Sequence, residues 1–433
     1  MSINECPDRS KAPETQPFGE LSLPEANIIY HSSGAKIHVF DGAEGSVCRL
    51  TMIWPGGEAD SSFCGRMSLA LQAIKDGNAT MSPSAVADCL DYNGARLVLS
   101  AGKHTSMLRL ICANSRIGRV LPVVLDCVLR PAMPQKSIDI LLENAAMSVA
   151  LAERQVMSRA MKAAARLIYG VSHPAAREAT PELIRSLTRD DLILSQQTVC
   201  NTVNGLDIYV AGKVTPEVLA TLDESISRFA SQASGHGIAP EYSPMCPEAP
   251  GVATEHIAGA LQSCIVMAFP SITRDNPDYQ ALRTTVMALG GYFGSRLMSN
   301  IREDKGLTYG IQAALLGERE GAYISISSQQ DTSNTDIVIN ETISEIEKLR
   351  TGLLDNTELE RLRNHAMSEI ATVLDTPFSI ADYRMCEVTE GMPDDYYHRL
   401  QQQVRTITAE KIRDMARKYI DPAMARTAIA TCP

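Results

Sequence analysis

The feature of this 433-residue chain that most limits its possible folds is a long internal repeat. An apolar segment that ends in proline, Cys48–Pro55, returns as Cys264–Pro270, and each copy is followed by a helical segment that stops at a glycine. Proline interrupts a strand and glycine often ends a helix, so each copy predicts a strand followed by a helix. Thr188 and Thr408 open the two most similar helical segments, each just before a strand. The chain is therefore predicted to contain two tandem homologous domains.

Each copy continues with a pattern typical of a β-hairpin, over 95–112 in the first copy and 309–328 in the second. Long helical segments follow, at 134–168 in the first copy and at 336–349 and 357–374 in the second. Within the last of these, Thr357 and Glu360 have the spacing of a capping box. Strands and helices mix without strict alternation, which predicts an α+β fold rather than a parallel doubly wound sheet.

The repeat and the composition of the segment between the copies suggest domain bounds. Gly, Ser and Pro are frequent between residues 231 and 252, which predicts a linker. We expect an N-terminal arm over 1–24, a first domain over 25–230 and a second domain over 253–433.

Composition narrows the class of protein. The formal charge of −11, from 40 basic and 51 acidic residues, argues against a nucleic-acid or anionic-membrane surface. The 11 cysteines form no Cys-x-x-Cys pair and several lie in apolar runs, which indicates free thiols in a reducing compartment. No charged-then-apolar leader pattern opens the chain, and no apolar run approaches the roughly 18 residues of a membrane span. These features predict a soluble cytoplasmic protein.

A glycine-rich turn at 290–294 leads into a helical segment that contains Arg302, and Tyr309 follows seven residues later. The turn follows a helix and lacks the lysine of a P-loop, so tight backbone packing is the better interpretation than a phosphate cradle. This stretch resembles the C-terminal domain of the pitrilysin-type, or insulinase-type, zinc peptidases. That family includes the insulin-degrading enzyme, the mitochondrial processing peptidases and small bacterial relatives.

The resemblance covers the chain from residue 25 onward. It implies two domains, each a mostly antiparallel sheet covered by helices, and two subunits that close around a chamber. In the family, the Arg and the Tyr reach into a catalytic site whose zinc is held elsewhere by His-x-x-Glu-His. The resemblance therefore implies a catalytic role for Arg302 and Tyr309, in which a guanidinium and a phenol stabilise oxyanion charge.

The zinc motif itself is missing from this chain. If Gly65 and Gly77 mark the family's helix, Ser68 and Gln72 stand where the two histidines should be, and Leu71 replaces the glutamate. Zinc requires imidazole, thiolate or carboxylate ligands, and leucine can neither bind metal nor act as a base. We therefore expect no metal in this chain, and zinc only in a partner subunit.

Other catalytic groups have weaker support. The family's third ligand should lie near Met147, where the chain has no carboxylate, and no two of the eight histidines have helical i, i+4 spacing. A thiol pair of Cys64 and His104 has nothing to set its geometry, since His104 lies in a hairpin turn and is expected to be exposed. His173 fits a structural loop of the family.

Two functions remain open. The leading hypothesis is a non-catalytic subunit of a two-chain zinc metallopeptidase, inactive as an enzyme on its own, which supplies Arg302 and Tyr309 to a zinc-bearing partner that cleaves peptides or unfolded proteins. The alternative is an inactive homodimeric binding or scaffold protein, which need not keep the Arg and Tyr pair. In either case the family's substrate-pairing edge strand corresponds to four consecutive residues, Arg96, Leu97, Val98 and Leu99.

Overall fold

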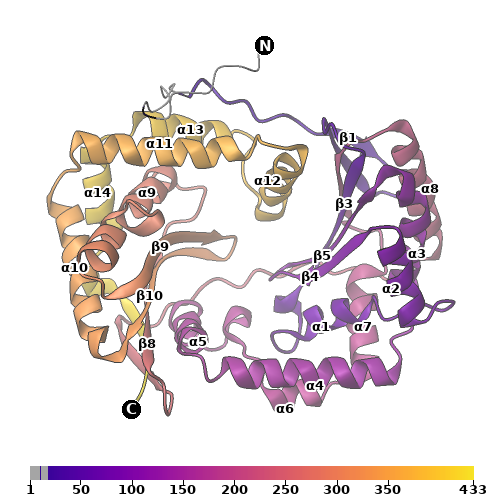
Figure 1. The fold of residues 1–433 in the computed structure, drawn as a ribbon, viewed down its shortest axis with the longest axis horizontal. Coiled ribbons are helices and arrows are strands. Elements are labelled where there is room, and N and C mark those ends of the chain that lie inside the picture. Colours follow the sequence, from indigo (N-terminus) through magenta and orange to yellow (C-terminus); the bar gives the residue numbers. More distant parts are fainter. Residues whose placement is uncertain (1–9, 11–17) are drawn as a thin grey trace.

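The computed structural model describes residue 10 and residues 18–433 of the chain. Most of the predicted N-terminal arm over 1–24, and Cys6 within it, lie outside the described residues. Two sheets stand on opposite sides of the molecule, each with helices packed against it (Figure 1). This arrangement confirms the predicted α+β class with two mostly antiparallel, helix-covered sheets.

The first sheet has six strands in the order β1-β2-β6-β3-β5-β4. Of its neighbouring pairs, only β2 and β6 run parallel. Its central strand β3 (Val47–Pro55) is buried over seven consecutive residues, which explains the unbroken apolar run seen in the sequence. The other strands are β1 (Asn27–Tyr30), β2 (Lys36–Asp41), β4 (Arg96–Ala101), β5 (Thr105–Ala113) and β6 (Asp207–Gly212).

The second sheet repeats the topology of the first with five strands in the order β7-β11-β8-β10-β9. Here β7 and β11 run parallel, and β11, β8, β10 and β9 pair antiparallel. Each sheet ends at one side in a hairpin strand, β4 in the first and β9 in the second. The strands are β7 (Gly251–His256), β8 (Gln262–Ser271), β9 (Thr308–Glu318), β10 (Gly321–Asp331) and β11 (Arg426–Thr431).

Helices bury the apolar faces of both sheets in two large cores. In the first half they are α1 (Arg66–Ala73), α2 (Pro83–Tyr92), α3 (Ile117–Leu129), α4 (Gln135–Ala152), α6 (Pro181–Arg185), α7 (Arg189–Cys200) and α8 (Pro216–Gln232). In the second half they are α9 (Tyr279–Val286), α10 (Thr335–Thr351), α11 (Asn356–Thr372) and α14 (Ala409–Tyr419). Helix α13 (Tyr396–Thr406) packs on α9 and α11 in a smaller cluster outside this core. Since α8 ends at Gln232 and β7 begins at Gly251, the connection without helix or strand spans 233–250.

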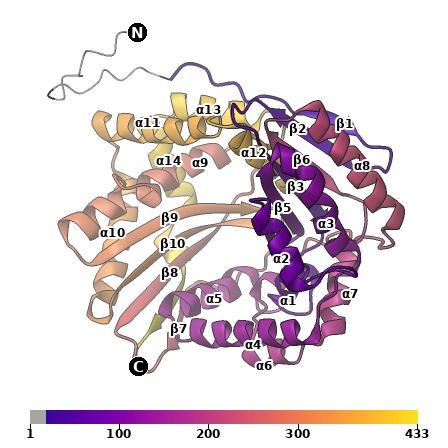
Figure 2. The same cartoon turned by 45° about the vertical axis from the view of Figure 1, so that its right-hand side comes forward.

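The helical segment predicted over 134–168 is two helices, α4 and α5 (Val156–Tyr169), separated at Glu153–Gln155. The break turns α5 away from its own half and onto the second sheet, where Ala160 and Ala164 pack against Cys264 and Val266 (Figure 1). Conversely, α12 (Pro377–Glu390) of the second half lies against the first sheet (Figure 2). Each half therefore contributes one helix to the other.

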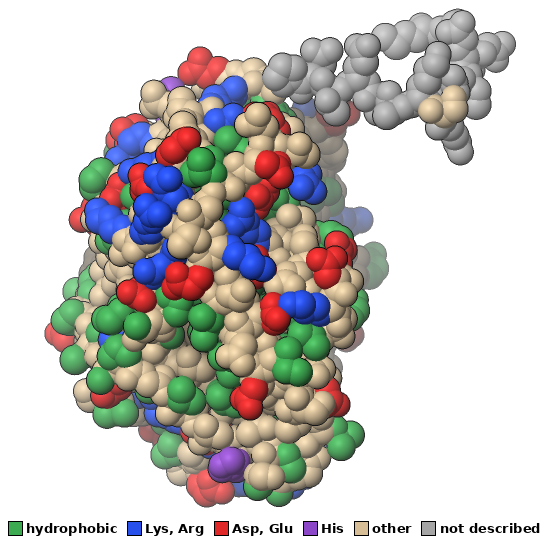
Figure 3. Space-filling view, turned by 90° about the vertical axis from the view of Figure 1, so that its left-hand side faces the viewer, with side chains coloured by type: hydrophobic (Ala, Val, Ile, Leu, Met, Phe, Trp, Pro, Cys, Tyr) green, Lys and Arg blue, Asp and Glu red, His purple; other side chains and the backbone are tan. Residues whose placement is uncertain are grey.

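Three smaller observations complete the description of the fold. The capping box expected at Thr357 is wrong, because Asp355, a stronger N-cap two residues earlier, accepts a hydrogen bond from the Glu358 amide and starts α11 at Asn356. On the face shown in Figure 3, basic and acidic side chains are intermixed. No helix in the described part of the chain is long and apolar enough to cross a membrane.

Candidate functional site

Arg302 and Tyr309 lie on consecutive elements of the second half. Arg302 belongs to a short helix, η5 (Met298–Asp304), and Tyr309 is the second residue of β9. Gly306, with a φ of 61°, makes the left-handed turn between them, and the amide of Leu307 donates to the Ile301 carbonyl at 3.0 Å. The structure thus brings the predicted pair together through a helix-to-strand reversal.

The Arg302 guanidinium contacts two aromatic rings. Its Cζ is 4.9 Å from the ring centroid of Phe293 and 5.0 Å from that of Tyr309. The two rings are 57% and 89% exposed. The three residues border an open depression of about 740 Å³, lined further by Met157, Gln262, Gly290, Gly291, Tyr292, Met298, Gly310, Ile311, Gln312, Ser327, Ser328 and Gln329. Among these described lining residues, Arg302 carries the one formal charge.

The glycine-rich turn forms one wall of this depression by close backbone packing. A Cβ on Gly290 would lie 2.7 Å from the Cβ of Ala313 on β9, and one on Gly294 would lie 2.9 Å from the Tyr292 ring. Real Cβ atoms do not tolerate such distances, so Gly290 allows the turn to approach β9 and Gly294 allows it to pass the Tyr292 ring. The contacts support the packing interpretation of the turn over a phosphate cradle.

The three degenerate zinc positions lie on α1. Leu71 is 1% exposed and belongs to the core, whereas Gln72 is exposed and Ser68 is half-buried. Ser68 donates its hydroxyl to the Glu58 carboxylate at 2.5 Å, and that carboxylate also accepts from the amides of Ser68 and Gly65, each at 2.8 Å. Glu58 therefore caps the N-terminus of α1 and satisfies Ser68.

The described residues form no metal-binding cluster elsewhere. Over residues 10 and 18–433, no three His, Cys, Asp or Glu side chains cluster closely enough to hold a metal ion. On α4, Glu143 forms an ion pair with Arg185 at 3.0 Å, and Met147 is exposed.

The Cys64 and His104 pair is not assembled either. His104 Nε2 hydrogen-bonds Glu320 at 2.9 Å. Among the described residues, no hydrogen bond joins the His104 ring to Cys64. Although Cys64 is an exposed residue, partial desolvation of its thiol and the neighbouring Glu58 carboxylate raise the thiol pKa, which lowers its thiolate fraction. The geometry therefore gives no support to a thiol mechanism.

The predicted substrate-pairing residues Arg96, Leu97, Val98 and Leu99 lie on β4, the edge strand of the first sheet. Leu97 and Leu99 pack against the core, and Arg96 is exposed. An edge strand has one row of unpaired backbone groups, which is the property that strand addition requires. Strand β9, which carries Tyr309, is likewise an edge strand.

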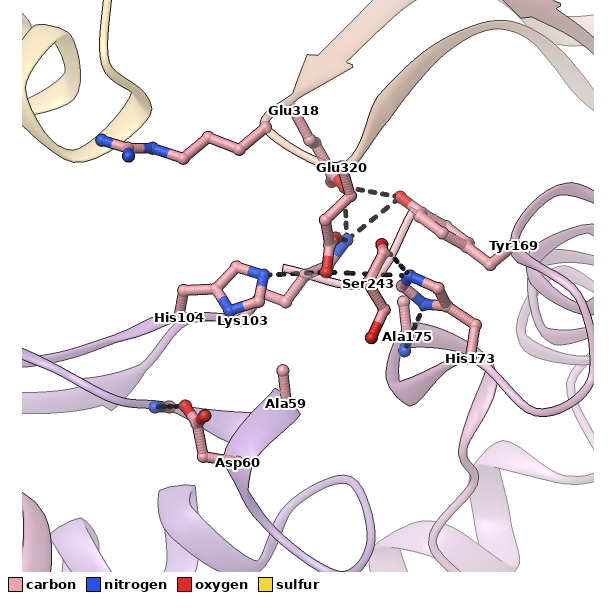
Figure 4. Close-up of polar contacts among 12 residues, drawn as sticks. Ala59, Asp60, Lys103, His104, Tyr169, His173, Ala175, Ser243, Glu318 and Glu320 are labelled. Carbon is pink, nitrogen blue, oxygen red and sulfur yellow. Dashed lines mark hydrogen bonds and ion pairs between the residues drawn. The ribbon is translucent and has the colours of Figure 1, made fainter. Parts of the chain in front are cut away.

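A polar cluster that the sequence did not reveal joins the two halves where their hairpin turns meet (Figure 4). Glu320, whose side chain is 1% exposed, lies 2.9 Å from Lys103 Nζ and 2.9 Å from His104 Nε2. Burial would raise the pKa of Glu320, but hydrogen bonds from His104 and Lys103 outweigh it and hold the pKa below its usual value. His104, expected to be exposed, is therefore partly buried by the opposite hairpin.

The end of α5 and the connection between the sheets complete this cluster (Figure 4). Tyr169 donates to Glu318 at 2.8 Å, and Lys103 also contacts Glu318. His173 lies 3.7 Å from Glu320 and hydrogen-bonds the Ser243 carbonyl at 2.8 Å, which agrees with its predicted structural role. No local motif marks these residues, because they come from four separate segments.

Comparison with known proteins identifies the fold. Residues 186–365 match the family model described as the peptidase M16 inactive domain. A sequence comparison with curated proteins finds no match. These findings and the structural similarities below confirm the resemblance predicted from the sequence.

Three solved structures illustrate the similarity. A peptidase M16 inactive domain from Pseudomonas fluorescens superposes with a TM-score of 0.82 at 19% identity, over 94% of this chain and 98% of that chain. A protease from Helicobacter pylori gives 0.80 at 13% identity, over 95% and 100%. A chain of Complex III2 from Candida albicans gives 0.72 at 12% identity, over 94% and 96%. At these identities the likeness shows the fold alone.

Proposed function

We propose that this chain, an inactive-type member of the pitrilysin family, is the non-catalytic subunit of a two-chain zinc metallopeptidase. The partner would carry His-x-x-Glu-His, and this chain would supply Arg302, Tyr309 and half of a chamber. Substrates would be peptides or unfolded proteins. One observation carries the proposal: the side chains of the half-buried Arg302 and the exposed Tyr309 make no hydrogen bond or ion pair with any other described residue, in a chain whose own zinc positions hold no ligands.

The chemistry of the pair suits peptide cleavage. In the complex, zinc bound by the partner would supply the Lewis acid that polarises the scissile carbonyl. The guanidinium of Arg302 and the hydroxyl of Tyr309 would donate hydrogen bonds to the oxygen where charge develops and hold the adjacent main chain. No described residue of this chain accepts a hydrogen bond from the Arg302 guanidinium or the Tyr309 hydroxyl. Both groups are therefore free to bind a substrate that lies across the partner.

The edge strands favour an extended substrate. A peptide that pairs with Arg96–Leu99 on β4 would gain main-chain hydrogen bonds that do not depend on its sequence.

We also propose a reducing compartment, the cytoplasm, because the ten described cysteines are all free.

The alternative is a homodimeric binding or scaffold protein. The similarity in fold to a chain of Complex III2 from Candida albicans, part of a multi-subunit assembly by its name, is the observation that favours it. A scaffold has no use for an exposed guanidinium and phenol at one depression, so the fate of this pair distinguishes the two functions.

Reconstitution tests the proposal. The tagged chain is co-expressed with a His-x-x-Glu-His subunit of the same family, and the purified complex is assayed on a peptide library with and without chelator. We expect chelator-sensitive cleavage by the complex and none by this chain alone. Failure of any such subunit to bind this chain, or full activity of the zinc subunit without it, would refute the proposal.

A further inference from the structure

We propose that Phe293 is a positioning residue for Arg302: its ring and that of Tyr309 hold the guanidinium, with its N–H edge free for a planar acceptor in the depression. The inference rests on the proposed function, because it assumes that Arg302 contacts substrate. It assigns a role in the site to Phe293, which is outside the Arg302 and Tyr309 pair, and a second role to Tyr309.

The two rings are the contacts that fix the Arg302 head group. The Arg302 side chain makes no hydrogen bond or ion pair with another described residue, and both ring centroids lie within the roughly 6 Å at which a cation is attracted to an aromatic face. Arg296, six residues earlier in the chain, is held differently, by two hydrogen bonds of 2.7 and 3.0 Å to Glu358. The carboxylate engages two of the five Arg296 donors, whereas contacts with aromatic rings engage none.

The backbone of the glycine-rich turn explains why Phe293 reaches this position. Tyr292 points inward and stacks on His365 of α11, with ring centroids 4.7 Å apart and planes 20° apart. Its neighbour Phe293 points outward, toward Arg302, with 57% of its surface exposed. The close approach of Gly290 to Ala313 fixes the turn against β9 and thus fixes Phe293 relative to Tyr309. The Phe293 ring does not pack in the core, and its contact with Arg302 accounts for its exposed position.

The geometry also indicates the class of ligand. A guanidinium that contacts aromatic rings through its face keeps its five in-plane donors, which match a carbonyl or carboxylate in that plane. Beside Arg302, the described lining of the depression contains the neutral amides of Gln262, Gln312 and Gln329, of which Gln329 donates to the Gln262 Oε1 at 2.6 Å. Amides can both donate and accept, as an extended main chain requires. The ligand class is therefore the main chain of a peptide, with one oxygen on Arg302.

The first test uses the full chain without a partner. In 15N-arginine spectra, the Nε–H signal that disappears in Arg302→Lys identifies Arg302, and the Arg296 signal serves as an internal control. In Phe293→Leu we expect the Arg302 signal to move to the position of a free, rapidly rotating side chain, with the Arg296 signal and the melting temperature unchanged. Phe293→Tyr should restore the wild-type signal. An Arg302 signal unchanged by Phe293→Leu would overturn the proposal.

The second test separates this inference from the proposed function. In the reconstituted complex, Phe293→Leu should lower kcat roughly two- to fivefold, the effect of one exposed cation–π contact. Phe293→Tyr should keep full activity, and Phe293→Leu should have no further effect in an Arg302→Ala background. If Arg302→Ala lowers kcat and Phe293→Leu does not, the positioning role is wrong and the proposed function stands. If Arg302→Ala has no effect, the proposed function fails, while the spectra still decide whether the rings hold Arg302.

Discussion

Arg49 on β3 and Asp382 on α12 form a two-pronged ion pair across the halves of the molecule, with nitrogen–oxygen distances of 2.9 and 2.8 Å. Arg109 on β5 donates to the same carboxylate at 2.7 Å. The Arg49 side chain is 8% exposed, and burial lowers the pKa of its guanidinium, which the Asp382 charge partly offsets. This contact attaches α12, the helix that the second half contributes to the first half, to the first sheet.

Replacement of Asp382 should therefore destabilise the protein. Asp382→Asn leaves the buried Arg49 without a counter-charge, and we expect a loss of about 1–3 kcal/mol in the free energy of unfolding, as for a buried charged group that loses its partner. Glu143→Gln breaks a fully exposed pair with Arg185 and should cost much less, because solvent screens the two charges. Urea denaturation measures both. Equal losses in the two variants would show that the Asp382 ion pair stabilises the protein no more than an exposed ion pair does.

The Glu320 cluster predicts a pH dependence of stability. Because the folded state lowers the pKa of Glu320, its contribution is fully present above the unfolded value near 4.5 and is lost as pH falls through the folded pKa. Glu320→Gln should therefore destabilise the protein at pH 7 and make its stability less sensitive to pH below 4.5. Thermal melts from pH 7 to pH 3 measure this, and parallel curves for the two proteins would contradict it.

The sequence predicted elements well where the signal is local. The apolar runs ending in Pro55 and Pro270 became the central strands β3 and β8, because a strand covered on both faces is apolar throughout. The reversal between Arg302 and Tyr309 also followed from local signals. The break between α4 and α5 did not, because Glu153–Gln155 contains neither glycine nor proline.

The sequence did not predict the contacts between distant segments. The ring of Phe293 meets Arg302 nine residues later only because Gly290 packs on β9, and the Glu320 cluster gathers residues from both hairpins, α5 and the connection. Such contacts depend on the relative placement of the two halves. For the same reason His104, read as an exposed turn residue, is partly covered.

The purified chain is expected to hold no stoichiometric zinc. Ser68 and Gln72 are poor ligands, Leu71 is buried, and the nearby Glu58 carboxylate is already occupied by the helix N-terminus and the Ser68 hydroxyl. Elemental analysis after exhaustive dialysis decides the matter. A tightly bound zinc in each chain, lost on Ser68→Ala, would refute the interpretation of α1.

The chain alone should not cleave peptides. The raised pKa of Cys64 and the engagement of His104 with Glu320 leave no activated nucleophile at this position. A peptide-library digest analysed by mass spectrometry is the measurement, with Cys246→Ala as the control for another exposed thiol. Chelator-insensitive products that vanish in Cys64→Ala and persist in Cys246→Ala would establish a thiol mechanism instead.

In the complex, Tyr309→Phe should reduce kcat without affecting assembly. The change removes the hydroxyl donor and keeps the ring that contacts Arg302, so the loss should be that of one oxyanion donor, roughly 10²–10³-fold. Tyr92→Phe, which removes the hydroxyl of another highly exposed tyrosine on α2, should leave kcat unchanged. Steady-state cleavage by complexes with wild-type and variant chains gives these values.

Arg302→Ala should cause a similar loss, and the variant with both changes should lose less than the product of the two effects, because both donors serve one oxygen. Strictly multiplicative losses would place Arg302 and Tyr309 at different steps or on different substrate atoms. Gel filtration of each complex confirms that assembly is intact, which restricts the effect to turnover. Full activity of the complex with both changes would leave the scaffold function as the explanation of this chain.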